Sequence, residues 1–159
     1  DTIIAGMSIT EERDKVIDFT RAYYPPAPSF YVALDGANAN LKSGVIAAQT
    51  GTIQAGHVAA TGATLVEFAT PDETIVAVRN GEADAVLADS DYLAPIIKES
   101  GGKLVQVGEV YLGDGIGLGV RETDKKLKEK MNKAITSMKQ DGSLNKLLVK
   151  WFGDDVKTY

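Results

Sequence analysis

Cysteine is absent from this sequence, and histidine occurs once, as His57. The absence of cysteine excludes thiol nucleophiles, disulfide bonds and thiolate metal ligands. Any metal site would need oxygen ligands, and no EF-hand spacing is present. A histidine-dependent triad also lacks the G-x-S-x-G turn that commonly carries its nucleophile. We therefore expect neither a metal nor a cofactor, and we interpret His57 as a surface or packing residue on or near a short helix.

Long apolar runs and an excess of basic charge are also missing. No run approaches the roughly 18 to 20 apolar residues that span a bilayer, so we expect no transmembrane segment. The formal net charge is −5, which argues against a nucleic-acid partner because no basic stripe is available to neutralise phosphates. The lysines of KKLKEKMNK are accompanied by Asp124 and Glu129, as on a solvated helix face.

Strand and helix signals alternate between residues 43 and 110. Strands are predicted at 44–48, 64–70, 83–89 and 103–110. The sequence Thr70-Pro71-Asp72-Glu73 predicts a helix start with a capping box and a proline in the first turn. Another helix is predicted over 90–99, kinked or starting late because of Pro95. Alternation at this spacing predicts a mostly parallel sheet flanked by helices.

The chain changes character after Gly113. The segment GDGIGLGVR (113–121) alternates glycine with apolar residues, which indicates close backbone packing or a bend more than a phosphate cradle. An amphipathic helix is predicted over 123–140, and Ser143 is predicted to cap another helix that extends to Phe152.

The first thirteen residues, DTIIAGMSITEER, combine a short apolar strand with a helix start. Thr10 is predicted to be a helix N-cap, with Arg13 in the first turn. Exposed backbone donors, the Ser8 hydroxyl and the Arg13 guanidinium suit recognition of a small carboxylate. Further along, RAYYPPAPSFYVAL predicts a strand over 29–34 after a proline-rich approach. Two extended crossings, here and at 113–121, are what a two-lobed hinge protein needs.

Six motifs in order resemble those of one protein family. The chain is similar to the polar amino-acid-binding solute receptors of ABC importers, bacterial extracellular solute-binding protein family 3, which have the type II periplasmic-binding fold. The motifs are DTIIAGMSITEER, VIDFTRAYY, QTGTIQ, NGEADAVLAD, GDGIGLGVR and DGSLNKLLVKWFG.

The resemblance implies an α/β fold with one complete lobe and the truncated remainder of a second lobe. The complete lobe is expected over 32–118 and the remainder over 1–31 and 119–159, with hinge strands near 27–34 and 113–120. The first motif lies well inside the family's chains, so the opening section of the family is expected to be missing. We expect the apolar stripe that this leaves exposed to include Leu127, Ile135, Leu147 and Trp151. The chain would then be a fragment of a longer receptor, or would associate with another copy of itself.

The resemblance also implies an amino-acid site in the cleft between the lobes. Arg13 would bind the ligand α-carboxylate, and Asp89 would bind the α-ammonium at the carboxyl end of its strand. The other ligand-binding residues implied are Ala5, Gly6, Ser8, Thr50, Gly51, Thr52 and Gln54. Three alternatives stay open: Asp89 caps the following helix, Arg13 pairs with Asp18, and Thr52 is only a helix cap.

The function that the resemblance implies is binding without catalysis. The chain would deliver an L-amino acid, polar or basic, to the membrane subunits of an ABC importer. It would be periplasmic, or extracellular and lipid-anchored, after removal of a signal peptide. Two alternatives use the same fold: a lyase similar to cyclohexadienyl dehydratase, with Glu67 or Glu82 as its general acid, and the ligand-sensing domain of a membrane receptor.

Overall fold

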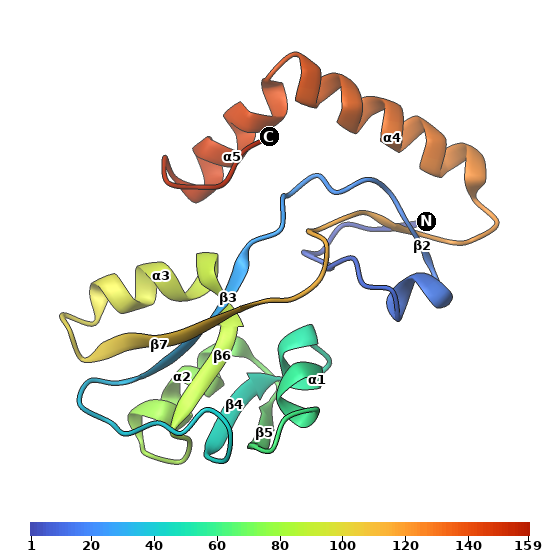
Figure 1. The fold of residues 1–159 in the computed structure, drawn as a ribbon. Coiled ribbons are helices and arrows are strands. Elements are labelled where there is room, and N and C mark those ends of the chain that lie inside the picture. The colour runs from blue at the N-terminus through green and yellow to red at the C-terminus, as the bar shows by residue number, and fades with distance from the viewer. The chain divides into compact units, whose positions relative to one another are not determined.

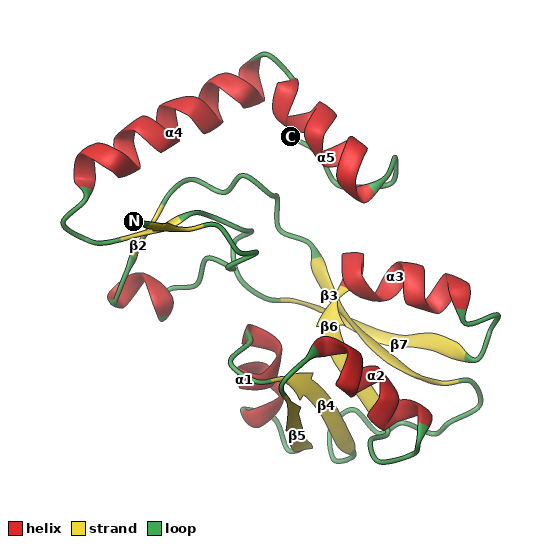
Figure 2. Ribbon diagram, turned by 180° about the vertical axis from the view of Figure 1, so that it is seen from behind, coloured by secondary structure: helices red, strands yellow, loops and turns green.

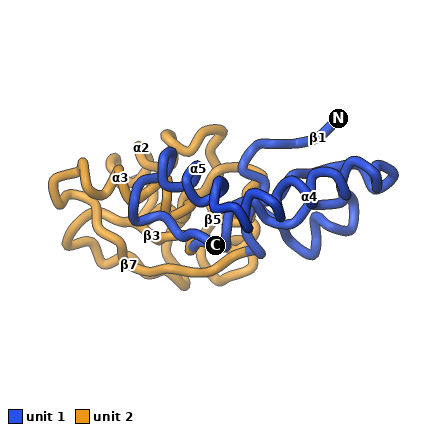
Figure 3. The backbone as a smooth tube through the Cα atoms, turned by 90° about the horizontal axis from the view of Figure 1, so that it is seen from above, with its two compact units in different colours: residues 1–27, 113–159 blue, residues 28–112 orange.

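The computed structural model describes residues 1–159, and they form two compact units (Figure 3). Unit 1 combines Asp1–Ala27 with Gly113–Tyr159, and unit 2 is the continuous segment Pro28–Leu112. Unit 2 therefore starts and ends before the expected limits of 32 and 118. The first difference arises because β3 (Pro28–Leu34) pairs along its whole length inside unit 2. The second arises because Ile116 forms bridges with Ser8 and Tyr24 of unit 1.

Unit 2 is built on a five-stranded sheet with the order β5-β4-β6-β3-β7 (Figure 1). The two pairs around β4 are parallel, but β3 runs antiparallel to both β6 and β7. The expectation of a mostly parallel sheet is therefore only half right. The strands other than β3 are β4 (Val45–Gln49), β5 (Thr64–Phe68), β6 (Ala85–Asp89) and β7 (Leu104–Tyr111).

Helices cover both faces of this sheet (Figure 2). Successive side chains of a strand point to opposite faces, so Val32, Ala47 and Val86 share one cluster with α2 (Pro71–Arg79) and α3 (Ser90–Glu99). The other cluster faces α1 (Ile53–Ala59), and its strand members are Tyr31, Ala33, Ile46, Ala85 and Leu87. The alternation along each strand thus specifies a three-layered α/β unit.

The helix starts in unit 2 follow local sequence signals. The Thr70 hydroxyl accepts a hydrogen bond from the Glu73 backbone and the Glu73 carboxylate accepts one from the Thr70 backbone, which confirms the predicted capping box. The next helix, α3, begins at Ser90 and continues through Pro95. Of the two alternatives expected because of Pro95, a kink or a late start, the late start is therefore wrong.

Unit 1 contains a small sheet whose strands are two residues long. Its order is β1-β8-β2, and both outer strands run antiparallel to β8. The predicted close packing of the glycine-rich segment is confirmed. A Cβ atom on Gly115 would lie 2.5 Å from the carbonyl oxygen of Tyr24, and one on Gly117 would lie 2.9 Å from the Ile9 side chain. The strands are β1 (Thr2–Ile3), β2 (Asp18–Phe19) and β8 (Gly119–Val120).

Two helices follow the sheet of unit 1. The first, α4 (Lys125–Gln140), is joined to β2 because Asp18 forms ion pairs with Lys125 and Lys128. The second, α5 (Ser143–Phe152), places Leu144 and Leu148 against Tyr24. No helix of the chain combines the length and the apolar character that crossing a bilayer requires.

Two expectations for unit 1 need correction. Thr10 does accept a hydrogen bond from the Arg13 backbone, but the helix there is one 3-10 turn, η1 (Arg13–Lys15), because the chain enters β2 directly afterwards. Of the side chains expected to be exposed, Leu147 and Trp151 are 43% and 72% exposed. Ile135 is buried, on the helix that Asp18 holds to the sheet.

Candidate functional site

Asp89 ends strand β6 and directly precedes α3. Its side chain makes no hydrogen bond to the first turn of that helix, although its backbone occupies the N-cap position. The interpretation of Asp89 as a helix cap is therefore wrong. Instead, its Oδ1 atom accepts a hydrogen bond of 2.7 Å from Nε2 of Gln54. The residue remains exposed, so its carboxylate is placed to meet a cation at the carboxyl end of the sheet.

Gln54 lies in the first turn of α1 and is buried. Its Nε2 atom also donates to Oγ of Ser29, at 2.9 Å, and Ser29 lies opposite Asp89 on the neighbouring antiparallel strand. The sequence analysis missed Ser29. The available signal was a hydroxyl in the apolar run SFYVAL, on the same side as Tyr31 and Ala33, but the register with β6 was needed to join it to Asp89.

The environment of Asp89 raises the pKa of its carboxyl above the usual aspartate range. The largest cause is desolvation of the carboxyl group by the protein atoms around it, although the residue as a whole stays exposed, and the negative charge of Asp91 adds to it. The hydrogen bond from Gln54 acts in the opposite direction, because it stabilises the ionised form. Gln54 is therefore the neighbour that favours a charged Asp89.

The loop Thr50–Thr52 opens α1 but already uses several of the donors expected for a ligand. The Thr50 backbone amide donates to the Phe68 carbonyl. The Thr52 hydroxyl donates to the Gln49 carbonyl and accepts from the Ala55 amide, so it is the helix N-cap. The alternative interpretation of Thr52 as a cap thus matches the structure. Gly51 between them has a φ of 75°, a backbone conformation that favours glycine.

Arg13 closes the loop that follows β1 in unit 1. Its Nη1 atom donates to the Ser8 carbonyl at 3.1 Å, and its backbone amide donates to Thr10 Oγ1 at 3.2 Å. The Asp18 carboxylate, considered as a partner for Arg13, forms ion pairs with Lys125 and Lys128 of α4. Ser8 and Arg13 are therefore the two predicted residues that the structure brings together in this unit.

Ala5 and Gly6 precede this loop and are exposed. Gly6 has a φ of 62°, and a Cβ atom there would meet nothing within 4 Å. Its backbone forms a hydrogen bond with Tyr23 that lowers the pKa of the phenol, but burial of the phenol has the larger effect and raises it. Gly6 therefore meets a conformational requirement of the loop, and its amide already has a partner.

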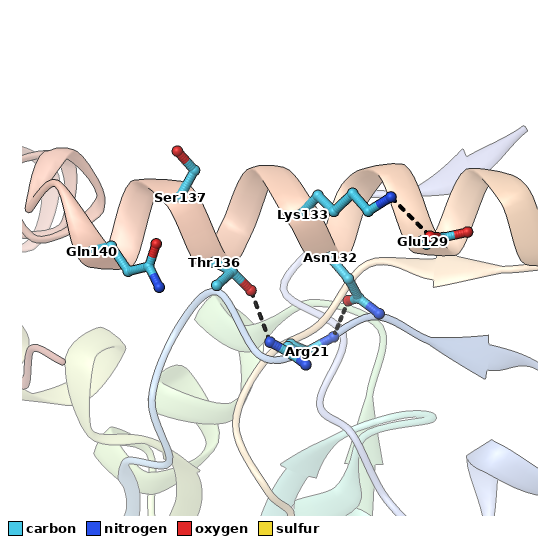
Figure 4. Close-up of a pocket in the computed structure, with 7 residues that line it drawn as sticks. All are labelled: Arg21, Glu129, Asn132, Lys133, Thr136, Ser137 and Gln140. Carbon is cyan, nitrogen blue, oxygen red and sulfur yellow. Dashed lines mark hydrogen bonds and ion pairs between the residues drawn. The ribbon is translucent and has the colours of Figure 1, made fainter.

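None of the nine predicted ligand residues lines the three hollows in the surface of unit 1. The one drawn in Figure 4 has a volume of about 410 Å³ and runs along α4. In it, Arg21 donates from its side chain to Thr136 and from its backbone to Asn132, while Lys133 pairs with Glu129. These polar groups are paired with one another, and they join α4 to the segment after β2.

The side chains considered for catalysis do not gather around Asp89. Glu82 precedes β6 and thus lies at the amino end of that strand, whereas Asp89 ends it. Glu67 is exposed on β5 at the edge of the sheet. His57 lies in α1, half-buried, and no three acidic or histidine side chains come together as metal ligands.

Comparison with known proteins groups the chain with bacterial solute-binding proteins. The profile of the bacterial extracellular solute-binding proteins, family 3, matches residues 1–154. The arginine-binding periplasmic protein of Mannheimia haemolytica is 31% identical over 96% of this chain. The L-arginine-binding protein of Pseudomonas aeruginosa is 32% identical over 98% of it. The chain spans 66% of the length of each of these two relatives.

A solved structure supports the same grouping. A periplasmic His/Glu/Gln/Arg/opine family-binding protein from Silicibacter pomeroyi, in complex with lysine, is 63% identical and superimposes with a TM-score of 0.94. The match covers 100% of this chain and 72% of that protein. The fold of the chain is therefore that of a periplasmic binding protein.

Proposed function

Because the chain belongs to the bacterial extracellular solute-binding proteins, family 3, we propose that it is the substrate-binding component of an ABC-type amino-acid transporter. It binds an L-amino acid without chemical conversion and delivers it to the membrane subunits of the importer. The observation that carries the proposal is the Asp89 carboxylate, which is exposed at the carboxyl end of β6 and held by Gln54 and not by the following helix. This placement suits an α-ammonium group.

The proposed ligand is a basic amino acid, in the order of preference arginine or lysine, then histidine. Two relatives are named for arginine, and the solved structure at 63% identity holds lysine. In this proposal Asp89 binds the α-ammonium group. Arg13 binds the α-carboxylate, for which its planar guanidinium offers two parallel donors. The chain then acts in the periplasm, as its relatives' names indicate.

Isothermal titration calorimetry of the purified chain with L-arginine, L-lysine, L-histidine and L-glutamine tests the proposal. Asp89→Asn should weaken binding by about 10-fold to 100-fold, since it removes the charge from a hydrogen-bonded ion pair. Asp35→Asn is the matched control, because Asp35 is an exposed aspartate of the same unit. Absence of a heat of binding for all four of these amino acids would overturn the proposal.

Arg13 is tested separately with Arg13→Lys, which keeps the charge and removes the planar fork. We expect binding to weaken by about 10-fold. Arg79→Lys, at the exposed end of α2, should leave the affinity unchanged. Equal affinity of Arg13→Lys and the unaltered chain would remove Arg13 from the ligand site.

We also propose that unit 1 associates with a second copy of the chain. Four apolar side chains support this: Ile4 is 67% exposed, Trp151 72%, Phe152 54% and Leu147 43%. Side chains of this kind mark an interaction surface when they form a patch. Light scattering should give the mass of a dimer, and Trp151→Lys should return it to that of a monomer. A monomer for the unaltered chain at high concentration would contradict association.

A further inference from the structure

Ser29 and Gln54 are buried polar residues in a unit whose interior is otherwise mostly apolar. Their side chains are 2% and 5% exposed. Burial of polar groups costs free energy unless they are hydrogen-bonded. The two residues bond to each other, and Gln54 bonds onward to Asp89. The arrangement therefore leads from the interior of unit 2 to one exposed carboxylate.

Gln54 is the donor in both of these hydrogen bonds. A glutamine amide carries two N–H donors. One is donated to Ser29 Oγ at 2.9 Å and the other to Asp89 Oδ1 at 2.7 Å. Because an ionised carboxylate only accepts hydrogen bonds, the nitrogen of the amide has to face Asp89. No N–H of the Gln54 side chain then remains for a ligand.

Three different elements fix the position of the Asp89 carboxylate. Ser29 is held in β3, in register with Asp89 of β6, and Gln54 is held in the first turn of α1. The bond from Gln54 reaches one carboxylate oxygen, Oδ1. The other oxygen, Oδ2, has no hydrogen-bond partner within the chain and can accept one from outside.

We propose that Gln54 and Ser29 are positioning residues, which orient the Asp89 carboxylate toward a ligand ammonium group and keep it ionised. The inference rests on the proposed function of Asp89, and it changes the role expected for Gln54 from ligand contact to support. Ser29 acts one step further back, because it accepts the second N–H of Gln54 and so prevents rotation of the amide.

The charges around Asp89 give this proposal a pH dependence. Asp91, from α3, is the charged neighbour that raises the pKa of Asp89, whereas α1 and β3 contribute the neutral Gln54 and Ser29. The hydrogen bond from Gln54 lowers that pKa. Removal of this hydrogen bond therefore raises the pKa of Asp89 further. As the pH falls, Asp89 then becomes neutral at a higher pH than in the unaltered chain, and binding of an ammonium group is lost at that higher pH.

Two measurements on Gln54→Leu test the inference. The pKa of Asp89 in the ligand-free chain is followed by carbon-detected NMR, and calorimetry with L-arginine and L-lysine is repeated at pH 5 and pH 8. We expect a higher Asp89 pKa, an affinity about 10-fold lower at pH 8, and a larger loss at pH 5. Gln106→Leu, on the exposed part of β7, is the matched control and should change none of these.

Ser29→Ala provides a second, smaller change if Gln54→Leu fails to fold, as judged by circular dichroism. It should raise the Asp89 pKa in the same direction. An unchanged Asp89 pKa, with affinity reduced equally at both pH values, would overturn the positioning role. If the unaltered chain binds no amino acid, the proposed function fails, while the NMR titration still decides whether Gln54 and Ser29 control Asp89.

Discussion

The Nζ atom of Lys139 lies 3.3 Å from the centroid of the Tyr159 ring. This contact belongs to a set that fastens the last residues of the chain to unit 1. The Tyr159 hydroxyl donates to the Ala22 carbonyl at 2.8 Å, and the Lys157 ammonium group donates to the Pro26 carbonyl at 3.1 Å. The Tyr159 backbone exchanges two hydrogen bonds with the Asn145 side chain. The polar segment after α5 is thus a structural part of unit 1.

Tyr159→Ala should lower the free energy of unfolding of unit 1 by about 1–2 kcal/mol. The reason is that it removes both the cation–π contact and the hydrogen bond to Ala22. Tyr159→Phe keeps the ring and should cost about half as much. Thermal unfolding followed by circular dichroism measures both, with Thr158→Ala as the control. Equal melting temperatures for all four chains would show that this segment contributes nothing.

Alkaline pH should weaken the same contact. Burial raises the pKa of Tyr159 to about 12, whereas an unfolded tyrosine ionises near pH 10. A group whose pKa is higher in the folded state contributes stability below the unfolded pKa and loses it as pH rises toward the folded one. Unit 1 should therefore lose stability between about pH 10 and pH 12. Tyr159→Phe should lose less over this range. The tyrosinate absorbance of the unaltered chain should include a late-titrating group that Tyr159→Phe lacks, in addition to the other tyrosines whose pKa is raised.

Acid pH should weaken the join between α4 and the small sheet. The hydrogen bond from Lys125 holds the pKa of Asp18 below its ordinary value, and Lys128 contributes to the same effect. A lowered carboxyl pKa stabilises the fold above the unfolded pKa, near 4, and this stabilisation is lost as pH falls through the folded value. Asp18→Asn should therefore be the less stable chain at pH 7 and should lose less stability between pH 6 and pH 2.5.

Thermal unfolding at several pH values measures this difference, and Asp154→Asn serves as an exposed aspartate without a lysine partner. If Asp18→Asn and the unaltered chain lose stability in parallel on acidification, the ion pairs with α4 do not contribute to the pH dependence.

Two glycine-to-alanine substitutions should change stability in opposite directions. Gly115 has a φ of 95°, and an added Cβ would lie 2.5 Å from the Tyr24 carbonyl oxygen. Gly115→Ala should therefore destabilise unit 1 by about 1–3 kcal/mol. Gly56 lies inside α1 with nothing within 4 Å of its added Cβ. Gly56→Ala should stabilise unit 2 by up to about 1 kcal/mol. Denaturant unfolding measures the change in the free energy of unfolding for each variant. Changes of the same sign in the two variants would contradict the packing argument.

Local sequence signals were sufficient where one element determines the outcome. The Thr70–Glu73 capping box and the strands of unit 2 were predicted from neighbouring residues alone. The close packing at Gly115 followed from glycine spacing. Asp89 was placed at a strand end for the same reason.

Long-range pairing was beyond these signals. Ser29 meets Asp89 because β3 runs antiparallel to β6, and no local pattern specifies the partner or the direction of a strand. The same limit explains the buried Ile135, which depends on how α4 is attached through Asp18. The 3-10 turn at Arg13 is short because the following residues pair with β8, another distant partner.

The continuous course of unit 2 has a consequence for the order of folding. Thr2 bonds to Gly119, 117 positions along the chain, so the sheet of unit 1 cannot form until most of the protein has been synthesised. Every strand of unit 2 finds its partners within that unit. Once unit 2 has folded, Pro28 and Tyr111 lie side by side as neighbours on β3 and β7. The two segments of unit 1 are then joined by this folded unit and no longer by a long flexible loop. Most of the entropic cost of bringing them together has therefore already been met.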